Sequence, residues 1–188
     1  MSATLIDPVP SFDEPLELMS ACHGRMTAQL ETLRRLAVWL PEHGADEEAR
    51  QAARAILRYF RVAAVHHHQD EESDVFPRLL ERVGTADRGR AEGLVRSLLA
   101  DHQELYAAWD TLRQRLEAIE AGAAAELPDR DVQFFTEQYR NHIECEELML
   151  FPLLRRCFSP ADLAELGARM SARRGASLSP RLDAARAS

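Results

Sequence analysis

Apolar side chains recur along most of the chain at intervals of three and four residues, a spacing that lines them up on one face of an α-helix. Between Asp13 and about Leu40 this face comprises Leu16, Met19, His23, Met26, Leu30, Leu33 and Leu36. Pro41 and Gly44 follow directly, and both residue types are typical of the end of a helix. We therefore predict a first helix over residues 13–40.

The same spacing continues from Asp46 to about Arg82 and predicts a second, longer helix. Asp46 is a suitable cap for its first turn, because its side chain can accept a hydrogen bond from a free backbone N–H. Pro77 lies inside this pattern. Because proline lacks a backbone N–H and crowds the preceding turn, we expect the helix to kink or break there.

Two further long helices complete the predicted set. A turn at residues 84–87 separates the second helix from a third, which runs to about Glu120. The loop AGAAAELPD then leads to a fourth helix from Asp129 to about Cys157, which again contains a proline, Pro152. No competing stretch shows the alternation of apolar and polar residues that is typical of a strand.

The two ends of the chain lack this long pattern. Residues 1–12 contain two prolines and little periodicity, and we expect them to form an arm. Ser159 and Pro160 can start a short fifth helix that ends near Arg173, since proline is favoured at the first helical position. Residues 174–188 are expected to be disordered.

Four long amphipathic helices joined by short loops favour one architecture. We predict an all-α fold, an antiparallel up-down four-helix bundle with a short extra C-terminal helix. The predicted division of the chain is an N-terminal arm over 1–12, the bundle over 13–158, and the short helix with its disordered tail over 159–188.

Composition and charge narrow the classes of function. The formal net charge of −8 argues against binding to nucleic acid or to an anionic membrane surface. No run approaches the ~20 apolar residues of a membrane span, and the N-terminus does not resemble a signal peptide, so we expect a cytoplasmic protein. Cys22, Cys145 and Cys157 lack CxxC spacing and are expected to be free, inert thiols.

One chemical motif, His-x-x-x-Glu-Glu-x-x-x-Phe-Pro, occurs twice with identical spacing. The two copies comprise His67, Glu71, Glu72, Phe76 and Pro77, and His142, Glu146, Glu147, Phe151 and Pro152. Residues four apart share a helix face, with Cβ atoms ~5–6 Å apart. The imidazole and the first carboxylate of each copy can therefore converge on the same metal ion or on adjacent ones.

A helix with one histidine precedes each copy, His23 in the first half and His102 in the second. Two such pairs of helices supply four imidazoles and two carboxylates to the centre of a bundle, from His23, His67, Glu71, His102, His142 and Glu146. One cation does not need six donors, whereas two cations do, especially if each glutamate bridges them. This mixed ligation favours iron, with manganese or zinc as weaker candidates.

Residues beside the two motifs are assigned lesser roles. A sequence neighbour lies ~100° around the helix, so we expect Glu72 and Glu147 at the surface or in the outer shell of the site. His66, His68 and Asp70 are interpreted as a solvated edge or as outer-shell partners of the ligands.

The complete pattern resembles the hemerythrin-like (HHE cation-binding) domain family over roughly residues 15–157. The resemblance implies a non-haem diiron centre with an oxo or hydroxo bridge, inside a four-helix bundle. By analogy, one iron is bound by His23 and His67, the other by His102 and His142, and the pair is bridged by Glu71 and Glu146.

Dioxygen carriers of that family have a fifth histidine four residues after the third, where this chain has Tyr106. Its phenol could ligate ferric iron, donate a hydrogen bond from the outer shell, or pack in the core. The departure argues against reversible oxygen binding for carriage. It favours redox chemistry, reaction with peroxide, or nitric oxide binding.

The resemblance therefore implies a protein that binds or reacts with a small oxidant (dioxygen, peroxide or nitric oxide) in carriage, sensing or detoxification. The alternative is an iron-buffering or iron-sensing protein without such chemistry. Weak peroxidase or oxidase activity at the diiron centre is left open. The expected partner is a small diatomic or peroxide ligand, with no nucleic acid and no membrane, and the sequence does not indicate an oligomeric state.

Overall fold

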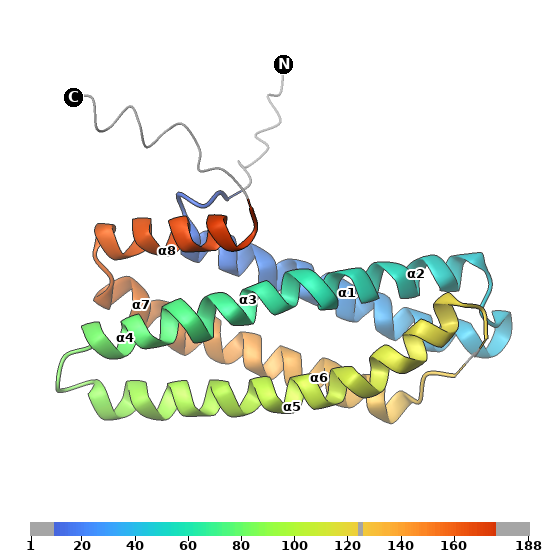
Figure 1. Cartoon of the computed structure of the whole chain (residues 1–188). Coiled ribbons are helices and arrows are strands. Elements are labelled where there is room, and N and C mark those ends of the chain that lie inside the picture. The colour runs from blue at the N-terminus through green and yellow to red at the C-terminus, as the bar shows by residue number, and fades with distance from the viewer. Residues whose placement is uncertain (1–9, 124–125, 176–188) are drawn as a thin grey trace, which may run out of the picture.

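The computed structural model describes residues 10–123 and 126–175, and within these ranges it is all-helical, with no strand (Figure 1). In chain order, with η for a π-helical turn, its elements are α1 (Pro15–His43), α2 (Glu47–Arg58), η1 (Tyr59–Ala63), α3 (Ala64–Asp70), η2 (Glu71–Val75), α4 (Phe76–Arg82), α5 (Arg88–Glu120), α6 (Asp129–Cys145), η3 (Glu146–Leu150), α7 (Phe151–Cys157) and α8 (Pro160–Arg173). The predicted all-α class and antiparallel bundle are confirmed. Most of the expected arm, and the expected disorder after residue 175, lie outside the described residues.

The sequence predicted that the first helix ends near Pro41 and Gly44 and that Asp46 caps the second helix, and the structure shows how both residues contribute. Helix α1 runs through Pro41 to His43, slightly beyond the predicted end, because the proline removes only one donor in the last turn. Gly44, at φ 67°, then closes the helix by donating its N–H to the carbonyl oxygen of Leu40 at 2.8 Å. Asp46 caps α2 as predicted, accepting a first-turn N–H at 2.8 Å.

The elements from α2 to α4 form one continuous rod over residues 47–82, and those from α6 to α7 form another over 129–157. Pro77 and Pro152 do not break their rods, so of the kink or break expected at Pro77, the break does not occur. Instead, a π-helical turn starts at Glu71 and at Glu146 and ends just before the Phe-Pro pair. The N–H of each phenylalanine bonds the carbonyl oxygen of that glutamate, five residues earlier. The wider turn eases the contact between the proline ring and the preceding carbonyls.

The four long rods pack side by side, each against two others (Figure 1). Helix α1 lies against α2 and α6, and α5 lies against the same two helices. Every rod therefore turns a broad face toward the centre, because it has a neighbour on each side. No helix within residues 10–123 and 126–175 is both long and apolar enough to cross a bilayer.

The buried apolar side chains form two clusters with a polar layer between them. On α1, Met19 belongs to one cluster and Met26 to the other, and His23 lies between them. On the rod of residues 129–157, Tyr139 and Leu150 belong to the two different clusters, and His142 and Glu146 lie between them. The fold thus interrupts the apolar core at one level, which is the level of the predicted ligands.

The first turn of α8 is attached to α4 through a buried carboxylate. Asp162 forms a capping box with Ser159 and accepts hydrogen bonds from Arg78 at 2.7 Å and from Arg82 at 2.9 Å. The bonds from Arg82 and Ser159, with that from Arg78, hold the pKa of Asp162 well below its usual value. The carboxylate is therefore ionised at neutral pH and fixes α8 to α4.

The last turn of α8 is attached to the ligand-bearing rod. Arg173 hydrogen-bonds the fully buried Asp70 and also donates to Asp74 at 2.6 Å. Arg174, which the sequence placed in the disordered tail, donates to Asp70 at 2.6 Å. Asp70 is therefore neither a solvated edge nor an outer-shell partner of the ligands, because it faces α8.

Candidate metal centre

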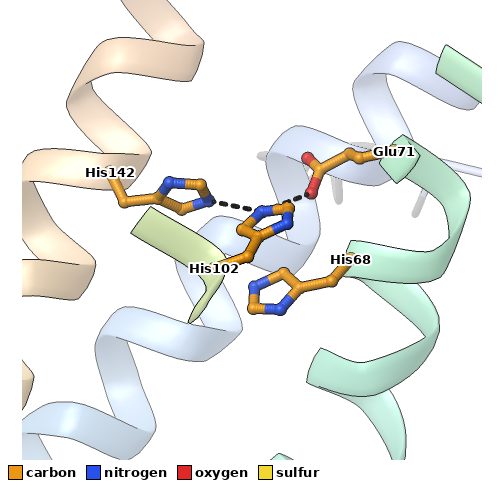
Figure 2. A group of neighbouring side chains, drawn as sticks. All are labelled: His68, Glu71, His102 and His142. Atoms are coloured by element: carbon orange, nitrogen blue, oxygen red, sulfur yellow. Dashed lines mark hydrogen bonds and ion pairs between the residues drawn. The ribbon is translucent and has the colours of Figure 1, made fainter. Parts of the chain in front are cut away.

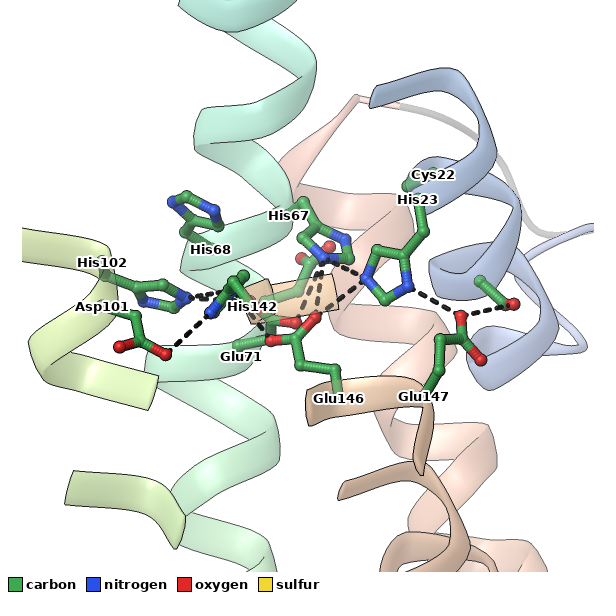
Figure 3. A network of polar contacts seen from close by, with 12 residues as sticks. Cys22, His23, His67, His68, Glu71, Asp101, His102, His142, Glu146 and Glu147 are labelled. Atoms are coloured by element: carbon green, nitrogen blue, oxygen red, sulfur yellow. Dashed lines mark hydrogen bonds and ion pairs between the residues drawn. The ribbon is translucent and has the colours of Figure 1, made fainter. Parts of the chain in front are cut away.

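The polar layer consists of histidine and glutamate side chains that point toward one another from all four rods (Figure 3). All six predicted ligands lie in it, each at most 3% exposed: His23, His67, Glu71, His102, His142 and Glu146. Their donor atoms form two groups, within each of which the atoms lie within 4.8 Å of one another: His23, His67, Glu71 and Glu146, and His68, Glu71, His102 and His142. The structure thus brings all six together and adds His68.

The two glutamates connect the two groups. Glu71 places Oε1 3.1 Å from Nε2 of His67, four residues earlier, and Oε2 3.4 Å from Nε2 of His102 on α5. Glu146 repeats this arrangement, with Oε1 3.1 Å from Nε2 of His142 and Oε2 2.9 Å from Nε2 of His23 on α1. Each carboxylate therefore spans from its own helix to the neighbouring one, as a bridge between two cations requires.

The second glutamate of each motif supports a histidine from the other half of the chain. Glu147 lies 2.7 Å from Nδ1 of His23, and Glu72 lies 2.6 Å from Nδ1 of His102. A carboxylate there accepts the Nδ1 proton, and this leaves the lone pair on Nε2, which faces the layer. Of the two roles that the sequence left open for these glutamates, the structure shows contact with candidate ligands.

The phenylalanine of each motif covers the same histidine from the side of the second apolar cluster. The ring of Phe151 stacks on that of His23 with centroids 5.4 Å apart, and Phe76 stacks on His102 at 6.0 Å. One motif therefore supplies two groups to its own metal position and two supporting groups to the other half. These two sets of contacts explain why the whole spacing from histidine to phenylalanine occurs in both halves of the chain.

The remaining two imidazoles are supported differently. Asp101 lies 3.5 Å from Nδ1 of His142, whereas the thiol of Cys22 contacts the imidazole of His67. Asp101 and Cys22 directly precede His102 and His23, so they occupy equivalent places in the two halves. The two metal positions consequently differ in the charge next to them.

Cys22 is buried, as expected, yet it interacts with the candidate site. Burial raises the pKa of its thiol, but the hydrogen bond and the charge of His67, together with Arg25, outweigh burial and lower the pKa. A guanidinium nitrogen of Arg25 lies 2.9 Å from Sγ. Cys145 and Cys157 are half-buried free thiols.

Tyr106 stands next to the layer and not within it. Its hydroxyl lies 3.2 Å from Nδ1 of His68, and its side chain is partly exposed. Burial, and then the charges of Glu72 and Glu71, raise its pKa to about 12. Of the roles that the sequence left open, the geometry favours a hydrogen-bonding phenol.

Within the described residues, the layer has the donor set of a metal site. The four oxygens of Glu71 and Glu146 are buried, and imidazole nitrogens are their polar contacts. The Nε2 atoms of His23 and His67 are 3.0 Å apart, and those of His102 and His142 are 3.2 Å apart. Lone pairs that converge on one another and on buried carboxylates need cations or protons between them.

Protons fill that role when no metal is bound. Burial lowers the pKa of His142, but Glu146 and Glu71 outweigh burial and raise it to about 9. The pKa of His67 likewise lies well above its ordinary value, since Glu71 outweighs burial. Metal ions that displace these protons would meet two carboxylates and neutral imidazoles. The residues present therefore fit a binuclear metal site.

Comparison with known proteins supports this assignment. A family model described as the hemerythrin HHE cation binding domain matches residues 14–154 of the chain. The chain is also similar to an uncharacterised protein of Haemophilus influenzae, with 32% identity over 164 residues, which are 87% of this chain and 92% of that protein. The family match includes both motifs and all six predicted ligands.

Proposed function

This chain belongs to the hemerythrin HHE cation-binding domain family, and from that premise we propose that its buried histidine and glutamate layer holds two iron ions. We propose further that this diiron centre binds or reacts with a small oxidant, namely dioxygen, peroxide or nitric oxide. When bound, the iron pair would supply the electrons for that chemistry. The chain supplies the ligands, a water-poor surrounding and fixed positions for protons.

The observation that carries the proposal is the position of the two glutamates. Each of them reaches an imidazole of its own helix with one oxygen and an imidazole of a neighbouring helix with the other. This arrangement suits a pair of cations with two carboxylate bridges. A single cation would leave part of the set buried without a partner, which is unfavourable.

Iron is favoured by the donors and by the charge. Imidazole and carboxylate together suit iron in proteins, and the thiol of Cys22 contacts His67 and is absent from both donor groups. The two carboxylates offset half of the charge of a ferrous pair. Manganese and zinc remain the weaker candidates.

The burial of the site favours a small reactant over an organic substrate. All six proposed ligands are at most 3% exposed, and apolar clusters lie on both sides of the layer. A diatomic molecule or peroxide can enter such a layer through small fluctuations of the packing, whereas a larger substrate would require a rearrangement of the core.

The test begins with full-length protein loaded with ferrous iron without oxygen. We expect two irons per chain, and we expect dioxygen, peroxide or nitric oxide to change the optical absorption. His67→Ala, which removes one proposed ligand, should lose at least one iron, whereas His43→Ala, at the far end of α1, should retain both. Wild-type protein without a stoichiometric pair of metal ions would refute the proposal.

An iron-buffering or iron-sensing role is the second candidate. Within the described residues it is favoured by the buried polar atoms of the layer that lack a hydrogen-bond partner, because metal binding would satisfy them and so couple metal occupancy to stability. This role would be favoured if dioxygen, peroxide and nitric oxide leave the optical absorption of the iron-loaded protein unchanged, and if a mild chelator removes the iron and the protein then unfolds. Sustained peroxide consumption would instead indicate a peroxidase.

A further inference from the structure

His68 is the buried histidine of the layer that the family pattern does not assign. It follows His67 on α3, and its side chain turns toward α5, where its ring stacks on that of His102 with centroids 4.1 Å apart. It is 1% exposed, and a ring nitrogen of His68 belongs to the group formed by Glu71, His102 and His142 (Figure 2). His68 is therefore the third imidazole of the group that contains His102 and His142.

The hydrogen bonds around His68 define which of its nitrogens is free. The hydroxyl of Tyr106 lies 3.2 Å from Nδ1 of His68, whereas Nε2 has no hydrogen-bond partner among the described residues. We assign the tautomer in which the phenol oxygen accepts the Nδ1 proton, because a phenol can accept as well as donate. Nδ1 carries the ring proton, and Nε2 keeps a lone pair.

That lone pair lies in the interior without a partner. In the described part of the chain, Nε2 of His68 is buried and makes no hydrogen bond. A buried acceptor without a donor is unfavourable and calls for an explanation. The ring of His68 contributes one nitrogen to a donor group with two other imidazoles and a carboxylate, and a cation bound there would accept the lone pair.

We propose that His68 is a fifth imidazole ligand, which binds through Nε2 the metal ion shared with His102 and His142, while Tyr106 is a positioning residue that fixes its tautomer. The inference rests on the binuclear site proposed above. It makes the site asymmetric, with three imidazoles at one metal ion and two, from His23 and His67, at the other. Because the added ligand is neutral, the charge balance of the site does not change.

The direct test uses wild-type protein labelled with ¹⁵N-histidine and loaded with ¹¹³Cd²⁺. A coordinated ring nitrogen shows a scalar splitting from ¹¹³Cd, so the spectrum counts imidazole ligands in the folded protein. Of the seven histidines in the chain, five should show a split nitrogen, and His43 and His66 should not. Four split signals, with His68 unsplit, would overturn the fifth ligand and leave the binuclear site intact. No split signal would overturn both proposals.

A set of variants tests the same point by affinity, with Co²⁺ as the optical probe. His68→Ala should weaken one of the two Co²⁺ sites at least about 10-fold and change its absorption bands, and added imidazole should restore them. The neighbouring His66→Ala is the matched control and should leave both sites unchanged. Wild-type affinity and bands in His68→Ala would overturn the proposal.

Tyr106→Phe examines the positioning role separately. The variant removes the acceptor of the Nδ1 proton and keeps the ring, so the Nδ1 resonance of His68 should shift while the ¹¹³Cd splitting of Nε2 is retained. An unchanged Nδ1 resonance would show that Tyr106 does not fix the tautomer.

Discussion

At the scale of single residues, three of the buried imidazoles have a carboxylate beside their second nitrogen. Carboxylates hold Nδ1 of His23 and His102 at 2.7 and 2.6 Å, and Asp101 lies 3.5 Å from that of His142. Such contacts fix the ring and raise the basicity of the ligand nitrogen. Their removal should weaken metal binding without removing a ligand.

Glu147→Gln tests this effect. The amide still fits beside His23, but it is neutral, so we expect metal affinity to fall by about 10-fold or more. Competition with a coloured chelator measures the change. Glu144→Gln, at an exposed position of the same rod, is the control and should bind as wild type. Equal affinity in both variants would show that the Glu147 contact does not matter for the metal.

The stability of the metal-free protein should depend on pH through His142. Its pKa rises from 6.5 in the unfolded chain to about 9 in the fold, so its contribution is fully present below pH 6.5 and is lost as pH rises through 9. The loss is on the order of 3 kcal/mol. Urea unfolding at pH 6, 7.5 and 9 should show a falling midpoint, and a constant or rising midpoint contradicts the assignment.

At the scale of elements, the π-helical turns at Glu71 and Glu146 separate the ligand part of each rod from its Phe-Pro part. The extra residue in the turn changes which side chains face the centre beyond the glutamate. A single-residue shift of this kind places Phe76 and Phe151 beside the histidines that they cover. Such turns are frequent at functional sites.

Pro152→Ala should reveal what the proline contributes. Alanine restores a backbone donor and removes the ring, so η3 can relax toward an α-helix. We expect metal affinity to fall several-fold, while the metal-free protein is equally stable or more stable. Pro160→Ala, at the first position of α8 where no such contact exists, is the control. Unchanged metal affinity would mean that the π turn does not need the proline.

At the scale of the whole molecule, α8 joins the bundle through charges at both of its ends. Asp162 binds two arginines of α4, and Asp70 receives Arg173 and Arg174. Asp70 is fully buried and directly precedes Glu71. The packing of α8 is thus connected to the backbone that carries one of the glutamates.

Combined replacement of Arg173 and Arg174 by glutamine should leave Asp70 buried with no cation. We expect a loss of about 3 kcal/mol of unfolding free energy, near the lower end for a broken buried ion pair, since the arginines are partly exposed. Chemical denaturation measures it. Arg140→Gln, at an exposed position, should change stability by less than about 0.5 kcal/mol. A loss that small in the double variant would contradict the argument.

The sequence predicted the bundle and the convergence of the six side chains because both follow from spacing along a helix. For His68, which has no histidine counterpart in the second motif, it left open a solvated edge or an outer-shell role, and the structure excludes the solvated edge because His68 is buried. In this bundle each rod has two neighbours, so His67 can face α1 while His68 faces α5. The burial of Asp70 depends on α8, which is distant in the chain, and no local pattern reveals it.

Each half of the chain supplies the carboxylate and the phenylalanine that contact a histidine of the other half. Glu147 and Phe151 serve His23, and Glu72 and Phe76 serve the corresponding histidine of the second half. Divided at the turn of residues 84–87, the polypeptide would yield two fragments, each with an unsupported histidine. Neither half of the chain can therefore complete the histidine and glutamate layer without the other half.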